Sequence, residues 1–173
     1  MLDDIPSCVE KRLCMKKPDW ENAVNAQFGV YREHSNAKMP EVAYSGSSAC
    51  FDLFAVEDTV IPARGSSLVP VGVRLTVPNG WYVEFATRSG HGIKHNLRVH
   101  PGIIDPGYAG PWTVKMFNLG DEDVTIEKGK GAVQCKVHRI PSIYLGEISK
   151  DIFDEYRDNA ERGEKGFGSS DKK

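Results

Sequence analysis

The chain has 173 residues, a formal net charge of −2 and a hydrophobic content of 40%, which suits one domain with an apolar core. So small a charge gives no electrostatic reason to expect nucleic acid as a partner. No apolar run approaches the roughly 20 residues that cross a bilayer, so no membrane is expected. The acidic start resembles neither a signal peptide nor a transit peptide. We therefore expect a cytoplasmic protein, or one of the host cytoplasm or nucleus if its source is viral.

The cysteine and histidine spacings do not predict a metal site. The four cysteines form no Cys-x-x-Cys pair, which argues against structural zinc and for reduced thiols. His91 and His95 stand four residues apart, but Gly90 and Gly92 predict that no helix forms there to align them.

Residues 1–27 differ from the rest of the chain and are compatible with short helical turns. From residue 28 onward, short apolar-rich runs are separated by turns that contain proline and glycine. This pattern of short runs and turns predicts an all-β fold, a jelly roll or distorted β-barrel of short antiparallel strands. The expected strands are Phe51–Val56, Ser67–Val77, Trp81–Phe85, Trp112–Phe117 and Ala132–Val137.

One short helix is expected near the end of the chain. Ser149 suits an N-cap, and acidic residues follow it in the first turn of a helix that reaches Arg157. The glycine-rich residues after it predict a flexible tail. The sequence thus predicts an N-terminal extension (1–27), a β domain (28–160) and a C-terminal lid (161–173).

The segment Gly102–Gly110 places one carboxylate, Asp105, in a Pro-Gly turn. Alternating apolar residues on both sides predict two strands joined here by a hairpin. A carboxylate held against Ile103, Ile104 and Tyr108 is costly, because desolvation disfavours its charged form, and this favours a functional role. An aspartate that hydrogen-bonds its own turn is the ordinary alternative, and the segment alone leaves both interpretations open.

Four further segments occur in order around this one. They are Ser48–Ala55, Ala86–Gly90, Gly129–Gln134 and Arg162–Ser170. The set of five resembles the motifs of the trimeric dUTPases, the dUTP nucleotidohydrolases, over roughly residues 28–170. The resemblance implies a homotrimer that binds dUTP between its subunits and hydrolyses it to dUMP and pyrophosphate with Mg²⁺.

Three residues, Arg88, Ser89 and Gly90, offer a guanidinium, a hydroxyl and an open backbone to an anion. By resemblance they bind the α- and β-phosphates, although an ordinary turn has the same composition. Gln134 resembles the family's phosphate-side glutamine, and its alternative is a pairing with backbone at a strand end. The family commonly carries Gly-Asp-Arg where this chain has Gly129–Gly131, which puts a structural charge pair at that turn in doubt.

The resemblance assigns the base, the sugar and the chemistry to other residues. Backbone groups of Gly102 and Ile103 would read uracil, and Tyr108 would stack under the deoxyribose unless it is simply a core aromatic. Asp105 would orient and deprotonate a water for in-line attack on the α-phosphorus. Asp52 resembles the aspartate that meets the water shell of Mg²⁺, with a structural hydrogen bond as the alternative.

The tail completes the implied site. Arg162 and Ser169 would hold the γ-phosphate while Phe167 stacks on the uracil ring. Gly168 is one of the glycines that would let the tail wrap over the ligand. A disordered tail is the alternative where the other motifs are disregarded.

Two other functions compete with this one. dCTP deaminase shares the fold and the Asp-Pro-Gly turn, but its chemistry needs a glutamate in the following strand, where this chain has the strongly basic Lys115. The second is a dUTP-binding regulator that acts through residues 1–27. A non-catalytic version of that regulator is disfavoured because Asp105 and the tail are both present.

Overall fold

The structure, a computed structural model, describes residues 26–165. These residues belong to two compact units, of which the first ends at Ile140 and the second begins at Pro141. The last strand ends at Arg139, whereas the sequence places the end of the β domain at residue 160. The three-part division drawn from the sequence stays a prediction.

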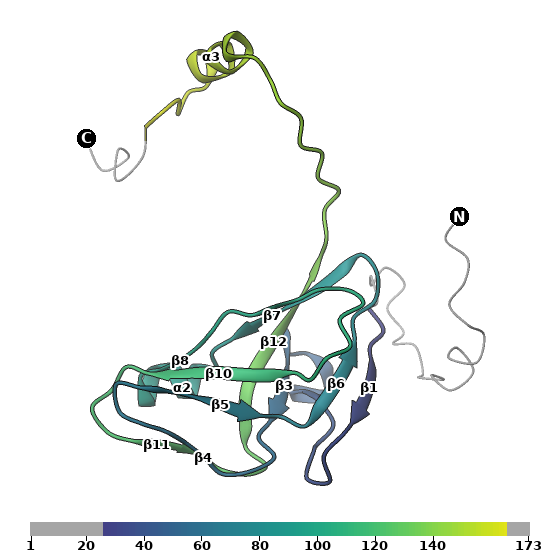
Figure 1. The fold of residues 1–173 in the computed structure, drawn as a ribbon, viewed down its shortest axis with the longest axis vertical. Helices are drawn as coiled ribbons and strands as arrows, with labels where there is room; N and C mark the ends of the chain where they lie inside the picture. Colours follow the sequence, from purple (N-terminus) through teal and green to yellow (C-terminus); the bar gives the residue numbers. More distant parts are fainter. Residues whose placement is uncertain (1–25, 166–173) are drawn as a thin grey trace, which may run out of the picture. The chain divides into compact units, whose positions relative to one another are not determined.

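The described part of the first unit is built almost entirely from short antiparallel strands (Figure 1). The strands are β1 (Gly29–Arg32), β2 (Glu41–Val42), β3 (Cys50–Phe54), β4 (Thr59–Ile61), β5 (Ser66–Pro70), β6 (Val73–Thr76), β7 (Trp81–Ala86), β8 (Leu97–Val99), β9 (Ile103–Ile104), β10 (Thr113–Asn118), β11 (Val124–Ile126) and β12 (Gly131–Arg139). They form one sheet in the order β2-β3-β12-β7-β9, a second in the order β5-β10-β8, and the pairs β1-β6 and β11-β4. The all-β prediction is confirmed.

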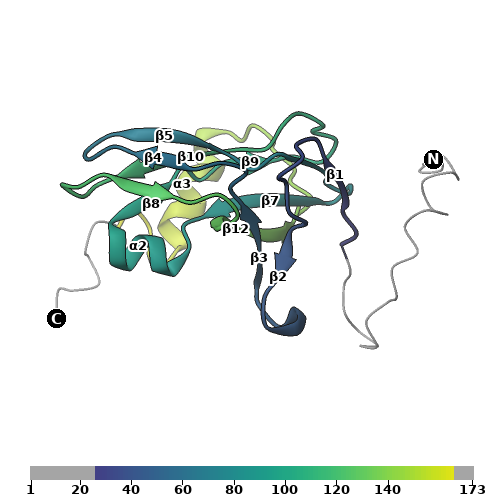
Figure 2. The ribbon, with the colours of Figure 1, turned by 90° about the horizontal axis from the view of Figure 1, so that it is seen from below.

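The core lies between the two larger sheets (Figure 2). Leu53, Val83 and Cys135 point inward from the first sheet, and Val114 and Met116 point inward from the second; all five are 0–1% exposed. Period-two alternation of apolar and polar residues produces this arrangement, because alternate side chains lie on opposite faces of a strand. Burial raises the pKa of the Cys135 thiol well above its usual range, so the thiol stays protonated.

One expected strand is two strands in the structure. The run Ser67–Val77 breaks at Gly72, which has a φ of 62°. A Cβ at this position would lie 2.7 Å from atoms of both His34 and Val56. Glycine therefore lets the chain turn sharply between β5 and β6 in a crowded place.

The structure contains two α-helices among residues 26–165, where the sequence predicts one. The unexpected helix, α2, spans Ser89–His95 and ends at Asn96, which adopts a left-handed conformation. The expected helix is α3 (Lys150–Asn159), and a single turn of 3₁₀ helix, η1, covers Tyr44–Gly46. No helix in the described range is both long enough and apolar enough to span a membrane.

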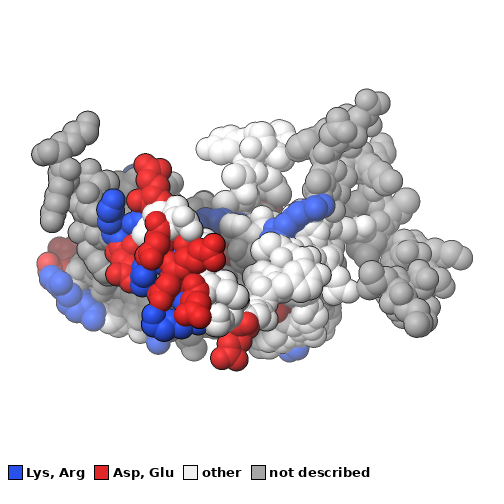
Figure 3. All heavy atoms as spheres, turned by 90° about the horizontal axis from the view of Figure 1, so that it is seen from above, with Lys and Arg blue, Asp and Glu red and all other residues white. Residues whose placement is uncertain are grey.

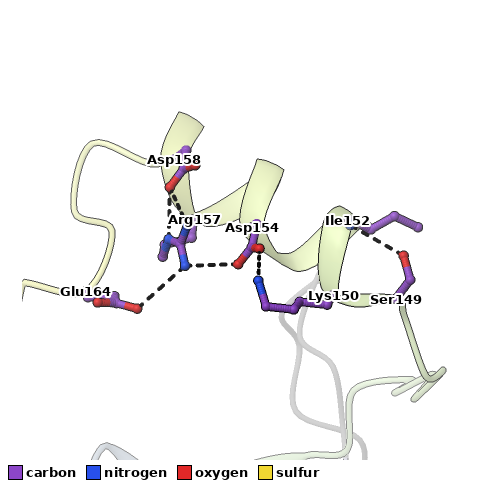
Figure 4. A network of polar contacts seen from close by, with 7 residues as sticks. All are labelled: Ser149, Lys150, Ile152, Asp154, Arg157, Asp158 and Glu164. Carbon is purple, nitrogen blue, oxygen red and sulfur yellow. Dashed lines mark hydrogen bonds and ion pairs between the residues drawn. The ribbon is translucent and has the colours of Figure 1, made fainter.

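The second unit consists of an extended segment followed by α3. The Ser149 hydroxyl accepts a hydrogen bond from the Ile152 amide at 3.5 Å, which confirms the expected N-cap. Arg157 forms ion pairs with Asp154 at 2.9 Å and with Asp158 at 2.8 Å (Figure 4). Acidic and basic side chains therefore lie side by side on this helix (Figure 3). Such ion pairs at a helix surface contribute only about 0–1 kcal/mol each to stability.

Candidate active site

Three of the motif segments meet on the outer face of the five-stranded sheet. The central strand β12 places Gln134 opposite Asp52 of β3 on one side and opposite Ala86 of β7 on the other. Residues paired across strands point to the same face. Asp52, Gln134 and the end of β7 therefore form one row, with polar side chains turned away from the core.

Arg88 lies just beyond the end of β7 and reaches into this row. Its Nη2 is 3.1 Å from Oδ2 of Asp52, and its Nη1 donates a hydrogen bond to the Gly131 carbonyl at 3.1 Å. The side chains of Arg88 and Asp52 are 36% and 21% exposed. A half-buried guanidinium with N–H groups still facing solvent can bind a phosphate oxygen.

Gln134 holds the turn that carries Arg88. Its Nε2 donates to the Thr87 carbonyl at 2.9 Å, and the Thr87 hydroxyl accepts from the Val99 amide at 2.9 Å. The backbone-pairing alternative for Gln134 is therefore present in the structure, and the contact fixes the chain immediately before Arg88. Thr87 lies within the Ala86–Gly90 motif segment, but sequence reasoning assigned it no role of its own.

The first residues of α2 complete the anion-binding side. Ser89 and Gly90 are exposed, and the amides of a helix's first turn have no partner within the helix. The prediction that glycines prevent a helix here is wrong. The chain hydrogen-bonds from the Gly92 amide to the Arg88 carbonyl at 3.0 Å, and tertiary contacts outweigh the low helix propensity of glycine.

His91 is a second residue that sequence reasoning missed as part of this region. Its Nε2 lies 2.7 Å from the Gly131 carbonyl oxygen. Burial lowers the pKa of His91, and the nearby Arg88 charge lowers it as well, while the hydrogen bond to Gly131 raises it. The imidazole is therefore neutral at neutral pH, with the Nε2 proton directed at the carbonyl.

The predicted catalytic turn has a different environment from the one expected. The Tyr108 amide donates to the Asp105 carbonyl at 3.3 Å, and Gly107 has a φ of 79°, so Asp105 begins a tight turn. Asp105 is exposed, and the expectation that apolar neighbours desolvate it is wrong for the isolated chain. Tyr108 is 44% exposed and donates to the Pro111 carbonyl at 3.2 Å, which rules out a core role for its ring.

Ile103 begins the edge strand β9, and Gly102 directly precedes it. The Gly102 carbonyl accepts from the Phe85 amide at 3.1 Å, and its amide donates to the His100 carbonyl at 2.7 Å. The Gly102 amide is thus already used within the chain, and its carbonyl retains one lone pair. Ile103 is 54% exposed.

Within one chain, Asp105 lies far from the ion pair of Arg88 and Asp52. Ile104, the last residue of β9, is paired with Val83 of β7, and the same register continued by one residue would place Asp105 opposite Tyr82, four residues before the row that contains Asp52. Four residues of strand span about 13 Å, and the three strand spacings from β9 to β3 span about 14 Å. For ideal strand geometry, these two spans together place the Cα atom of Asp105 about 19 Å from the Cα atom of Asp52.

The remaining predicted site residues belong to the C-terminal end of the chain. Arg162 lies in the second unit, where its Nε donates to the Lys165 carbonyl at 3.0 Å. Phe167, Gly168 and Ser169 lie outside the described residues. Between residues 26 and 165, no cluster of three or more His, Cys, Asp or Glu side chains could hold a metal by itself.

At one end of a sheet, this antiparallel β protein carries a guanidinium, a hydroxyl and backbone amides beside glycine-containing turns, which are groups that bind phosphate oxygens. Residues 35–171 match the family model described as dUTPase. The chain belongs to the dUTPase family.

Individual relatives agree with this assignment. The deoxyuridine 5'-triphosphate nucleotidohydrolase of Candida albicans is 37% identical over 143 residues, which cover 83% of this chain and 87% of the relative. The Staphylococcus bacteriophage 80alpha dUTPase, solved with dUpNHpp, is 26% identical with a TM-score of 0.70, over 83% of this chain and 97% of that one. A mutant dUTPase of the S. aureus phage phi11, solved to examine a structural Mg(II) ion, is 21% identical with a TM-score of 0.66, over 72% of this chain and 97% of that one, and supports the fold alone.

Proposed function

We propose that this protein hydrolyses dUTP to dUMP and pyrophosphate, with Asp105 activating the water that attacks the α-phosphorus. The observation that carries the proposal is the turn at Asp105, which presents an exposed carboxylate next to the half-exposed ring of Tyr108. A carboxylate that accepts a hydrogen bond from a water both orients it and removes its proton. The ring beside it offers an apolar surface on which a deoxyribose can pack.

The triphosphate would bind at the other end of the sheet. Arg88 supplies charge, Ser89 and Gly90 supply a hydroxyl and backbone amides, and Gln134 holds the turn that aims them. Arg162 of the tail would add a second guanidinium at the γ-phosphate. Fixed cations and amides stabilise charge that builds up on phosphate oxygens in the transition state.

The nucleoside end would be recognised along β9 and by the tail. The backbone of Gly102 and Ile103 would meet the edge of uracil, with Phe167 and the neighbouring Gly168 and Ser169 covering the ligand. A backbone donor–acceptor pattern rejects cytosine because its exocyclic group reverses the hydrogen-bond polarity at C4. Tyr108 would exclude a 2′-hydroxyl by contact with the sugar.

A homotrimer would supply a complete site. The separation of about 19 Å between Asp105 and Asp52 is too large for one nucleotide's α-phosphate to meet both Asp105 and the guanidinium beside Asp52. A ring of three copies brings the Asp105 turn of one subunit to the Arg88 turn of a neighbour, because a head-to-tail interface joins two different surface patches.

Mg²⁺ is the implied cofactor, and the side chains present suit it in a limited way. Asp52 is a half-buried carboxylate with one oxygen paired to Arg88, so its other oxygen can accept hydrogen bonds from metal-bound water. Mg²⁺ in nucleotide sites keeps several waters and binds chiefly through phosphates, so one carboxylate is sufficient. When bound, the ion would neutralise triphosphate charge.

A deaminase function lacks support at the residue where it would need a proton shuttle. Lys115 of β10 is exposed, and its Nζ lies 5.3 Å from the centre of the Phe117 ring. A lysine side chain has no carboxylate with which to relay protons as a glutamate does.

The direct test supplies dUTP, dCTP, dTTP and UTP in parallel and measures pyrophosphate and ammonia. We expect pyrophosphate from dUTP, far less from the other three nucleotides, and no ammonia from dCTP. Steady ammonia release from dCTP would assign the chain to the deaminases instead.

A further inference from the structure

The helix that begins the phosphate site has no apolar anchor. α2 has seven residues, two of them glycine, and none of its side chains is buried. Its one aliphatic side chain, Ile93, is 82% exposed. A helix this short is unstable alone, and interior glycines weaken it further. The placement of α2 on the sheet therefore depends on polar contacts.

His91 makes such a contact. Its Nε2 meets the Gly131 carbonyl oxygen at 2.7 Å, and the same oxygen accepts from Nη1 of Arg88 at 3.1 Å. A carbonyl has two lone pairs, so both donors can be accommodated at once. One backbone oxygen of β12 thus holds both the N-cap residue of α2 and a side chain from its first turn.

Gly131 leaves the room that this arrangement requires. A Cβ there would lie 2.6 Å from both Cζ and Nη1 of Arg88, a distance that side-chain carbons do not occupy. The φ of Gly131 is not positive, so the backbone conformation itself would accept another residue. In this chain the Arg88 guanidinium lies against the Gly131 backbone, in space that a side chain at position 131 would occupy, so a larger residue there would displace the guanidinium.

We propose that His91 and Gly131 are positioning residues of the phosphate site. The imidazole fixes α2 to β12, and the glycine, which has no side chain, leaves room for the Arg88 guanidinium beside Asp52. This inference rests on the proposed function, in which Arg88 binds the triphosphate. Neither residue contacts the nucleotide. Both act by setting where Arg88, Ser89 and the helix amides point.

Three substitutions on α2 test the role of the imidazole. His91→Leu removes the donor, and we expect kcat/KM for dUTP to fall about 3- to 10-fold, through a rise in KM, with kcat within about twofold. His91→Gln keeps an N–H near the Nε2 position and should restore KM to within about twofold of the wild type. The matched control is His95→Gln, an exposed histidine on the same helix, which should leave both constants unchanged.

The melting temperature, together with separate values of KM and kcat, distinguishes a positioning role from a role in general stability. A merely structural role would lower the melting temperature and kcat together, because less enzyme is folded, and would leave KM unchanged. An unchanged KM in His91→Leu, or a Gln variant no better than the Leu variant, would overturn the role of His91.

Gly131→Ala tests whether the space beside Gly131 positions the Arg88 guanidinium. The added methyl displaces the flexible end of Arg88, so KM for dUTP should rise about 10- to 100-fold, and calorimetric binding of dUpNHpp should weaken equally. On an Arg88→Ala background the same change should add less than about twofold, because the residue it acts through is gone. An inactive wild type would overturn the proposed function and this inference with it. An active wild type with unchanged Gly131→Ala kinetics would overturn the role of Gly131 alone.

Discussion

Mixed trimers provide a quantitative test of the shared site. Asp105→Asn in one chain removes the base, and Arg88→Ala in a second chain removes the phosphate contact. A water bound to a carboxylate at about 3 Å, attacking within about 3.5 Å, puts the α-phosphorus about 6 Å from Asp105. Arg88 must lie about 3 Å from a phosphate oxygen. These distances cannot cover the separation of about 19 Å from Asp105 to Asp52, which pairs with Arg88.

The two variants would be co-expressed with different affinity tags and purified on both tags in series. Every trimer that is retained in both purification steps contains both chains. A ring of three then has one junction where an intact Arg88 faces an intact Asp105 of the neighbouring subunit. We expect each variant alone to be nearly inactive, and the mixed trimers to recover about one third of wild-type turnover. Mixed trimers that stay at the residual level of the single variants would refute a site shared between neighbours.

Four further outcomes are expected. Asp105→Asn should bind dUpNHpp normally while kcat falls about 10²- to 10⁴-fold, and near-normal turnover would mean that another group activates the water. A chain ending at Glu161 should stay folded while turnover falls by at least about 10²-fold, since it loses a guanidinium at the γ-phosphate; unchanged turnover would exclude a catalytic tail. Asn118→Ala should lower the free energy of unfolding by about 2–4 kcal/mol, because the 1%-exposed amide makes three hydrogen bonds; a change below about 0.5 kcal/mol in a denaturant titration would contradict this. The pKa of His91 is lowered from 6.5 by burial, so its contribution to stability is present above about pH 6.5 and is lost as pH falls towards the lowered value. The melting temperature of His91→Gln should therefore depend less on pH in that range than that of the wild type. The same pH dependence in both proteins would contradict a role for His91 protonation in stability.

Local alternation predicted the strands that build the sheets. The expected runs at Trp81–Phe85, Trp112–Phe117 and Ala132–Val137 correspond to β7, β10 and β12, to within two residues at each end. The helix after Ser149 followed from its cap and acidic first turn, which are also local signals. The motifs placed Arg88, Gln134 and Asp52 in one site, and the pairing of β12 with its two neighbours explains why they meet.

Contacts between distant residues could not be predicted in the same way. α2 forms despite Gly90 and Gly92 because His91 and Arg88 hold it to Gly131, 40 or more residues away in sequence. The exposure of the Asp105 carboxylate depends on β9 pairing with β7 at the edge of the sheet, whereas the sequence indicated only a hairpin with apolar neighbours. In both cases the deciding interaction joins segments whose pairing no local pattern encodes.

Hydrolysis of dUTP in oxygen-18 water tests the central claim most directly, because it reports which phosphorus the activated water attacks. Mass spectrometry of the products should find one heavy oxygen in dUMP and none in pyrophosphate, and Asp105→Asn should suppress this labelling with the loss of turnover. Heavy oxygen in pyrophosphate, or labelling of dUMP at an undiminished rate in Asp105→Asn, would contradict attack on the α-phosphorus by a water that Asp105 activates.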